Sequence, residues 1–232
     1  MTRRLALIHT VPSLVPVFGD LTRELAPDVS TTDFVDEALL EEAVAAGEVP
    51  PPTADRLERH VRRALDEGAD AVLVTCSSMG GVVDELRVRH GWPLLRVDEA
   101  MVDAALDAGS RIGVVATLGS TLRPTAELVR SRARELGRDD ASFDVVTRLV
   151  DGAFAALKAG DLDAHDDAVR AALRELLPQV DAIILAQASM ARVAGTLDPG
   201  EAATAPILSS PRLGVERAVE LLDRLDAGHA SG

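Results

Sequence analysis

The chain has 232 residues, of which 47% are hydrophobic and 27% charged, and it carries a formal net charge of -14. A chain of this length and apolar content can bury a substantial core, which excludes intrinsic disorder, and its single cysteine, Cys76, excludes a disulfide framework. The acidic charge, four phenylalanines, one tryptophan and no tyrosine argue against a nucleic-acid partner. No apolar run approaches the ~18 residues of a membrane span, so no membrane partner is expected.

Short apolar runs alternate with amphipathic stretches along the chain. The first run, LALIHT at 5–10, is followed by prolines and by no small-residue cleavage site, which predicts a buried strand rather than a signal peptide. We therefore expect a cytoplasmic protein whose thiol stays reduced. Further strands are predicted at 31–35, 71–75, 94–97, 112–117, 143–149, 182–186 and 207–208, and helices at 54–67, 99–108, 121–136, 162–177 and 211–225. The prolines at 50–52 and the acidic stretch before them predict a loop. This alternation predicts an α/β fold with parallel sheets.

The sequence contains an internal repeat. Residues 70–82 read DAVLVTCSSMGGV and residues 181–193 read DAIILAQASMARV, and LALIHT at 5–10 is matched by IGVVAT at 112–117. The repeat predicts a duplication, although buried strand–helix units also resemble one another without one. We expect a first half of residues 1–97 with 211–232 and a second half of residues 98–210. Ligands in open α/β sheets bind at the carboxyl ends of the strands, where both repeated motifs end.

Cys76 directly follows one of these predicted strands. A thiol between a strand end and a helix start lies near exposed N–H groups, which predicts a lowered pKa and a reactive sulfur. The hydroxyls of Ser77 and Ser78 and the neighbouring amides would form an anion cradle. A buried and inert cysteine is the alternative. His9, at the end of the first strand, could assist the thiol or be a hydrogen-bonded structural residue.

The sequence predicts neither a metal nor a cofactor. It has no Cys/His cluster at zinc-ligand spacing and no glycine-rich nucleotide motif. Pyridoxal phosphate needs a lysine, and Lys158, the sole lysine, has no phosphate loop beside it. His60, His90, His165 and His229 lie among charged or terminal residues and are predicted to be solvated.

These motifs resemble those of the aspartate/glutamate/hydantoin racemase superfamily. VTCSSMGG at 74–81 is similar to the family's first cysteine motif, and LAQASM at 185–190 is similar to the second, with Gln187 in place of the second cysteine. LALIHT ends where glutamate racemases carry Asp-Ser, and ATLGST at 116–121 resembles the family's carboxylate-binding loop. The resemblance implies two pseudo-symmetric flavodoxin-like halves, each a small parallel sheet flanked by helices, with a cofactor-free site in the cleft between them. It implies catalytic roles for Cys76, Gln187 and His9, and substrate contacts from Thr10, Ser77, Ser78, Thr117, Ser120, Thr121, Ala188 and Ser189.

Gln187 is the departure from the family pattern. An amide has no proton to exchange near neutral pH, so a two-thiol racemisation is not expected of this chain. We predict a cofactor-independent enzyme of the racemase and isomerase type that acts on a small carboxylic or amino acid through one thiol, by one-base proton transfer, decarboxylation or covalent cis–trans isomerisation. The alternative is a non-catalytic relative that binds a small acid. A homodimer or a higher homo-oligomer is compatible with the sequence.

Overall fold

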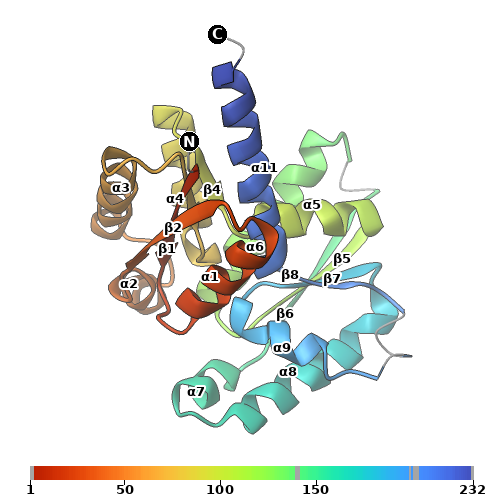
Figure 1. Ribbon diagram of the computed structural model, residues 1–232. Helices are drawn as coiled ribbons and strands as arrows, with labels where there is room; N and C mark the ends of the chain where they lie inside the picture. The colour runs from red at the N-terminus through yellow and green to blue at the C-terminus, as the bar shows by residue number, and fades with distance from the viewer. Residues whose placement is uncertain (1–2, 139–141, 199, 201–203, 231–232) are drawn as a thin grey trace. The chain divides into compact units, whose positions relative to one another are not determined.

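The computed structural model describes residues 3–138, 142–198, 200 and 204–230, with side chains as far as residue 227 (Figure 1). The chain divides into two compact units, residues 1–97 with 211–232 and residues 98–210, which we call the first and the second half. Each half contains a four-stranded sheet in which every paired strand is parallel. The predicted α/β fold in two halves is confirmed.

The sheet of the first half has the strand order β2-β1-β3-β4. Helices cover both of its faces, so the residues of β1 and β3 are buried in continuous runs rather than in alternation. Ala6, Ile8 and Val74 belong to the core on one face, whereas Leu5 and Leu7 belong to the core on the other. The strands are β1 (Arg3–His9), β2 (Val29–Val35), β3 (Ala71–Val74) and β4 (Leu94–Arg96), and the helices are α1 (Leu14–Leu25), α2 (Ala38–Ala46), α3 (Pro51–Asp66), α4 (Gly80–His90) and, from Pro211 onward, α11 (Ser210–Ala230).

The sheet of the second half repeats this order as β6-β5-β7-β8. In both halves the third strand of that order leads into a short 3-10 turn, η1 (Ser77–Met79) after β3 and η3 (Ala188–Met190) after β7. The repeated sequences 70–82 and 181–193 therefore adopt the same succession of strand, turn and helix. The strands are β5 (Arg111–Ala116), β6 (Asp144–Leu149), β7 (Ala182–Leu185) and β8 (Ile207–Ser209), and the helices are α5 (Glu99–Ala108), α6 (Gly119–Glu135), α7 (Ala153–Lys158), α8 (Leu162–Leu176), the 3-10 turn η2 (Leu177–Gln179) and α9 (Ala191–Ala194).

Every predicted strand is present, but the loop predicted around the prolines is wrong. Pro51 and Pro52 occupy the first positions of α3, where a fixed φ and a missing N–H are compatible with a helix. The residues before them form α2, which ends at Gly47 with a φ of 74°. α1 and α2 were not predicted. Among the described helices, none has both the length and the apolar character of a membrane span.

Candidate active site

The carboxyl ends of β1 and β3 bring Thr10 and Cys76 together in the first half. The two strands are paired with Ile8 opposite Val74, so Thr10 and Cys76, two residues further along each strand, lie on the same face. Cys76 has an extended backbone, with φ -119° and ψ 111°, and starts the η1 turn. Its side chain is buried, and the residue is 8% exposed.

The thiol of Cys76 is surrounded by hydrogen-bond donors. The side chains of Thr10 and Ser78 and the backbone N–H groups of Ser78 and Met79 all contact the sulfur, and each of these contacts favours the thiolate. Burial acts in the opposite direction and is the larger effect, so the pKa of Cys76 is raised above its ordinary value. The predicted lowering of the pKa is therefore wrong for the free protein. Near neutral pH the sulfur keeps its proton and is suited to donating it.

His9 does not contact this thiol. Its Nε2 lies 3.0 Å from Oδ1 of Asp33 and its Nδ1 lies 2.9 Å from Oγ1 of Thr75, so both ring nitrogens are occupied. The ring is fully buried 5.6 Å from the ring of Phe18, in the core on the opposite face from Cys76. Burial lowers the pKa of His9, although the bond to Asp33 partly opposes it. The structure thus brings Thr10, rather than His9, to the sulfur, and a catalytic role for His9 stays a prediction.

A buried arginine supports the turn that carries the thiol. Arg96, which is 4% exposed, ends β4 and donates a hydrogen bond to Oδ2 of Asp84 at 2.5 Å. Its guanidinium occupies the space beside Gly80, where a Cβ would lie 2.7 Å from Nε and still closer to Nη2 and Cζ. Gly80 follows η1 directly, so its missing side chain is what allows the cation to pack under the Cys76 turn. Nothing in the sequence analysis singled out Arg96.

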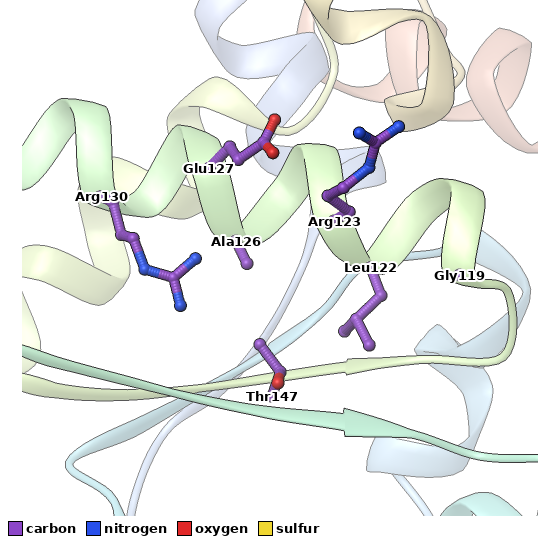
Figure 2. A pocket seen from close by; sticks show the side chains of 7 residues that line it. All are labelled: Gly119, Leu122, Arg123, Ala126, Glu127, Arg130 and Thr147. Carbon is purple, nitrogen blue, oxygen red and sulfur yellow. The ribbon is translucent and has the colours of Figure 1, made fainter. Parts of the chain in front are cut away.

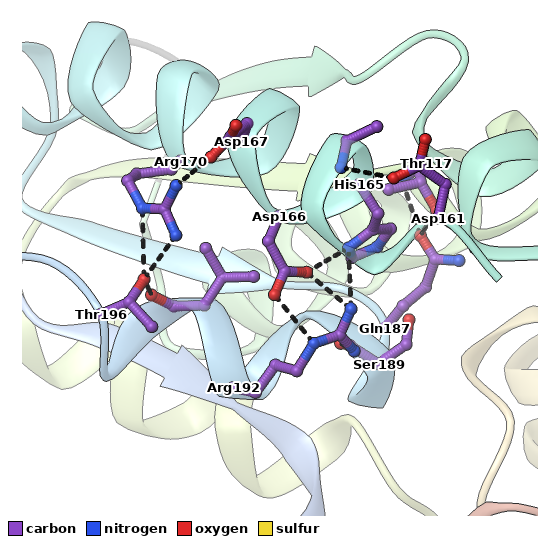
Figure 3. A network of polar contacts seen from close by, with 12 residues as sticks. Thr117, Asp161, His165, Asp166, Asp167, Arg170, Gln187, Ser189, Arg192 and Thr196 are labelled. Atoms are coloured by element: carbon purple, nitrogen blue, oxygen red, sulfur yellow. Dashed lines mark hydrogen bonds and ion pairs between the residues drawn. The ribbon is translucent and has the colours of Figure 1, made fainter.

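In the second half, the carboxyl ends of β5 and β7 bring Thr117 and Gln187 together. Oε1 of Gln187 accepts hydrogen bonds from the backbone N–H of Thr117 at 2.6 Å and from its hydroxyl at 2.9 Å (Figure 3). No described residue accepts a hydrogen bond from Nε2, so the amide keeps a donor for a ligand. Within the described part of the chain, the buried hydroxyl of Ser120 in the first turn of α6 also lacks a partner. The other predicted residues of this half are Thr121, buried in α6, and Ala188 and Ser189 in η3.

The prediction for His165 is wrong, because this residue is fully buried. It belongs to the inner face of α8 together with Val169, Leu173 and Leu176, at a helical spacing that the sequence already contained. Nδ1 lies 2.7 Å from Oδ1 of Asp166, while Nε2 is buried and has no hydrogen-bond partner among the described residues.

Arg192 connects the pair formed by His165 and Asp166 to the turn that follows β7. Its guanidinium contacts both carboxylate oxygens of Asp166, at 2.6 and 3.0 Å, and donates to the backbone carbonyl of Ser189 at 2.8 Å (Figure 3). Burial alone would raise the pKa of Asp166, but the hydrogen bonds from Arg192 and His165 hold it below its ordinary value. Asp166 is therefore an ionised partner for His165.

A cavity of about 280 Å³ lies elsewhere in the second half, between α6 and the edge strand β6 (Figure 2). None of the predicted site residues lines it. Within the described residues, no group of three or more His, Cys, Asp or Glu side chains is arranged to hold a metal ion. The cavity is lined by Gly119, Leu122, Arg123, Ala126, Glu127, Arg130 and Thr147.

Comparison with known proteins shows the family and the fold. Residues 10–218 match the Asp/Glu/Hydantoin racemase family model, whereas a comparison with curated proteins finds no match. The allantoin racemase of Klebsiella pneumoniae is 18% identical with a TM-score of 0.66, over 95% of this chain and 88% of that one. The glutamate racemase of Francisella tularensis is 12% identical with a TM-score of 0.70, over 97% and 83%. An arylmalonate decarboxylase mutant with a cysteine in place of a glycine is 20% identical with a TM-score of 0.61, over 95% and 93%.

Proposed function

Because this chain belongs to the Asp/Glu/Hydantoin racemase family, we propose that it is a cofactor-independent enzyme that acts on a small carboxylic or amino acid through the thiol of Cys76. The family match, which the sequence resemblance predicted, supports an enzyme of the racemase and isomerase type. The substrates in the names of the structural neighbours belong to those proteins. The class of small acid is carried over from the glutamate racemase and the arylmalonate decarboxylase, since allantoin has no carboxyl group.

The observation that carries the proposal is the environment of Cys76. A protonated thiol can give its proton to a carbanion or enediolate, which forms when a substrate loses carbon dioxide, or loses a proton to a separate base, next to a carboxylate. The sulfur is then left as a thiolate, and the hydrogen bonds from Thr10, Ser78 and the backbone of Met79 stabilise that charge. These donors are in place before the reaction, so they need no reorganisation when the charge develops.

Gln187 suits binding rather than proton transfer. Its Oε1 is engaged by Thr117, and its free NH₂ group can donate a hydrogen bond to a substrate oxygen. With no second thiol, three reactions are left: decarboxylation followed by protonation from the thiol, one-base proton transfer at Cys76, and covalent cis–trans isomerisation of an unsaturated diacid. The last two require that the thiol first lose its proton when the substrate binds, because the thiolate is the base and the nucleophile. That the strand-end residues of both halves serve one substrate stays a prediction of the family resemblance.

The test is turnover of a defined panel by wild-type protein and by Cys76→Ser. The panel contains both enantiomers of aspartate and glutamate, allantoin, phenylmalonate and maleate, with proton NMR in deuterated water as the readout. We expect one class of acid to be turned over by the wild type and none by Cys76→Ser, since a hydroxyl is a far weaker acid than a thiol. Far-ultraviolet circular dichroism controls for the fold of the variant.

A non-catalytic acid-binding protein is the second candidate. The occupied nitrogens of His9 and the amide at position 187 favour it, because neither supplies an exchangeable proton to a ligand. A ligand that raises the melting temperature equally in wild type and Cys76→Ser, with no turnover in either, would establish this function instead. Full activity of Cys76→Ser would also refute the assignment of the thiol.

A further inference from the structure

We propose that His165, oriented by Asp166, is the proton-transferring group of the second half, in place of the thiol that Gln187 replaces. The inference rests on the proposed function, because it assigns a proton-transferring group to the enzyme proposed there. Four observations support it: the position of His165 at the edge of the sheet, the hydrogen bond at Nδ1, the free Nε2, and the donors at the neighbouring strand ends.

The topology places His165 at the carboxyl edge of the sheet. Leu176, near the end of α8, packs on β5, where a Cβ on Gly113 would lie 2.6 Å from Cδ2 of Leu176. From Leu176 back to His165, α8 extends over roughly 16 Å. From Gly113 forward to Thr117, β5 extends over roughly 13 Å in the same direction. Val169 and Val115, which lie between these points, share one core. The first turn of α8 therefore lies at the strand ends that carry Thr117 and Gln187.

Arg192 provides a direct link between this turn and the residues after Gln187. Its Nη1 donates to the carbonyl of Ser189 in η3, and its Nη2 lies 3.2 Å from Nδ1 of His165. Figure 3 shows the contacts among His165, Asp166, Arg192 and Ser189 and, as a separate pair, the contact between Thr117 and Gln187. The guanidinium of Arg192 therefore contacts both His165 and the η3 turn that follows Gln187.

The hydrogen bond to Asp166 determines the tautomer of His165. Two groups compete for Nδ1, because an ionised carboxylate only accepts hydrogen bonds and a guanidinium only donates them. The contact with Oδ1 of Asp166, at 2.7 Å, is shorter than the contact of 3.2 Å with Nη2 of Arg192, and Nη2 already donates to Oδ1 of Asp166 at 2.6 Å, so we assign the hydrogen to Nδ1. In the neutral ring Nε2 is then a bare acceptor, and it is buried without a described donor. A carboxylate that fixes Nδ1–H and leaves Nε2 free is the arrangement by which a histidine serves as a general base.

The proton step that follows is balanced without an oxidant or a reductant. The lone pair of Nε2 takes the proton from the carbon next to the substrate carboxylate, and the electron pair of the broken C–H bond passes into an enediolate. Asp166 stabilises the imidazolium, and the Thr117 hydroxyl and the Gln187 amide are donors available to the enediolate oxygens. The reverse step returns the proton to carbon. Gln187 therefore acts as a donor of hydrogen bonds, while the proton itself is carried by His165.

His60 offers a matched control. Like His165 it contacts a carboxylate, with Nε2 2.9 Å from Oδ2 of Asp36, but its side chain is 25% exposed and it belongs to the first half. His60→Gln removes a histidine from an Asp–His pair just as His165→Gln does. An effect confined to His165→Gln is therefore not a general consequence of losing such a pair.

The first test is independent of turnover. In protein labelled with ¹⁵N-histidine, which has five histidines, His165→Gln identifies the signal of His165. We expect the signal of the neutral ring to show a protonated Nδ1 and an unprotonated Nε2, and Asp166→Asn to abolish this preference. A neutral ring with the hydrogen on Nε2 in the free wild type would overturn the proposal.

The second test measures hydrogen exchange at carbon with the two enantiomers of aspartate and of glutamate in deuterated water. We expect His165→Gln to lower exchange of one enantiomer by ~10²–10⁴-fold with little change in KM, and His60→Gln to leave it unchanged. Alkylation of Cys76 by iodoacetamide should proceed equally in all three proteins, which shows that the first half is intact. Wild-type exchange rates in His165→Gln would overturn the proposal.

The two tests separate this inference from the proposed function. Loss of exchange in Cys76→Ser together with normal exchange in His165→Gln would leave the proposed function standing and refute the role of His165. If the wild type exchanges none of these four amino acids, the exchange test gives no support to the role of His165, and the tautomer measurement decides. The opposite tautomer refutes that role, and the expected tautomer retains it. If His165→Gln does not fold, the exchange test is made with His165→Asn, and the ¹⁵N spectrum of Asp166→Asn tests the tautomer of His165.

Discussion

Gly80→Ala tests how the turn of Cys76 is supported. An alanine Cβ at position 80 would lie 2.7 Å from Nε of Arg96 and closer still to Nη2 and Cζ, whereas ordinary contacts begin at 3.4 Å. The guanidinium must then retreat by about 1 Å or the turn must shift by the same amount, because ordinary contact cannot otherwise be restored. Gly81→Ala is the matched control, since a Cβ at the next position of α4 meets nothing within 4 Å.

The magnitude follows from opposing contributions. Overpacking a buried site costs ~1–3 kcal/mol, and weakening the bond of 2.5 Å from Arg96 to Asp84 adds to this cost. Replacing a helical glycine by alanine contributes ~0.5–1 kcal/mol in the other direction at both positions. We therefore expect Gly80→Ala to destabilise the protein by ~1–2 kcal/mol and Gly81→Ala to be neutral or slightly stabilising.

Urea denaturation followed by circular dichroism measures this difference. With a slope of ~2–3 kcal/mol/M, the midpoint of Gly80→Ala should fall by roughly 0.5 M relative to wild type, while that of Gly81→Ala should not fall. Turnover should also decrease in Gly80→Ala at temperatures where it is folded, because η1 positions the donors to the sulfur. Equal midpoints for the two variants would refute the packing of Arg96 beneath this turn.

Three further predictions concern ionisable groups and the missing thiol. Because burial raises the pKa of Cys76, iodoacetamide should alkylate it more slowly at pH 7 than it alkylates glutathione, and a faster reaction would contradict this environment. Because burial lowers the pKa of His9, the unfolded state binds more protons at that site below ~pH 6.5, so stability should fall as the pH decreases from 7 to 5. His9→Gln should weaken that pH dependence of the melting temperature, and an unchanged slope would refute it. Gln187→Cys should raise racemisation of an α-acidic substrate, by less than the ~10²–10⁴-fold of a fully supported acid–base group, as followed by polarimetry; an unchanged rate would count against position 187 facing the substrate.

Much of the fold was readable in the sequence because it depends on local patterns. Continuous apolar runs predicted all the strands, and the repeat of 70–82 at 181–193 predicted two halves, which share one strand order. The helix α2 was missed because the prolines at 50–52 and the acidic stretch before them suggested a loop, and α1 was not predicted either. Pro51 and Pro52 are compatible with the first turn of a helix, so α3 begins at these prolines and no loop separates it from them.

The side-chain contacts at the site were predicted less well. The alternation of side chains along β1 and β3 already assigns Thr10 and Cys76 to one face and His9 and Thr75 to the other, and this signal was overlooked. The sequence motif instead suggested that His9 and the thiol are partners. Asp33, which binds His9 from the neighbouring strand β2, had no local signal at all.

By itself the sequence determined which residues end the strands: Cys76 after β3, Thr117 after β5 and Gln187 after β7. These positions follow from patterns a few residues long, because the side-chain periods of strands and helices are local properties of the chain. Only the tertiary structure decided the raised pKa of Cys76, since desolvation depends on what packs around a group from distant segments. The free Nε2 of His165 is likewise a result of packing: Asp166 engages one ring nitrogen and no described group reaches the other.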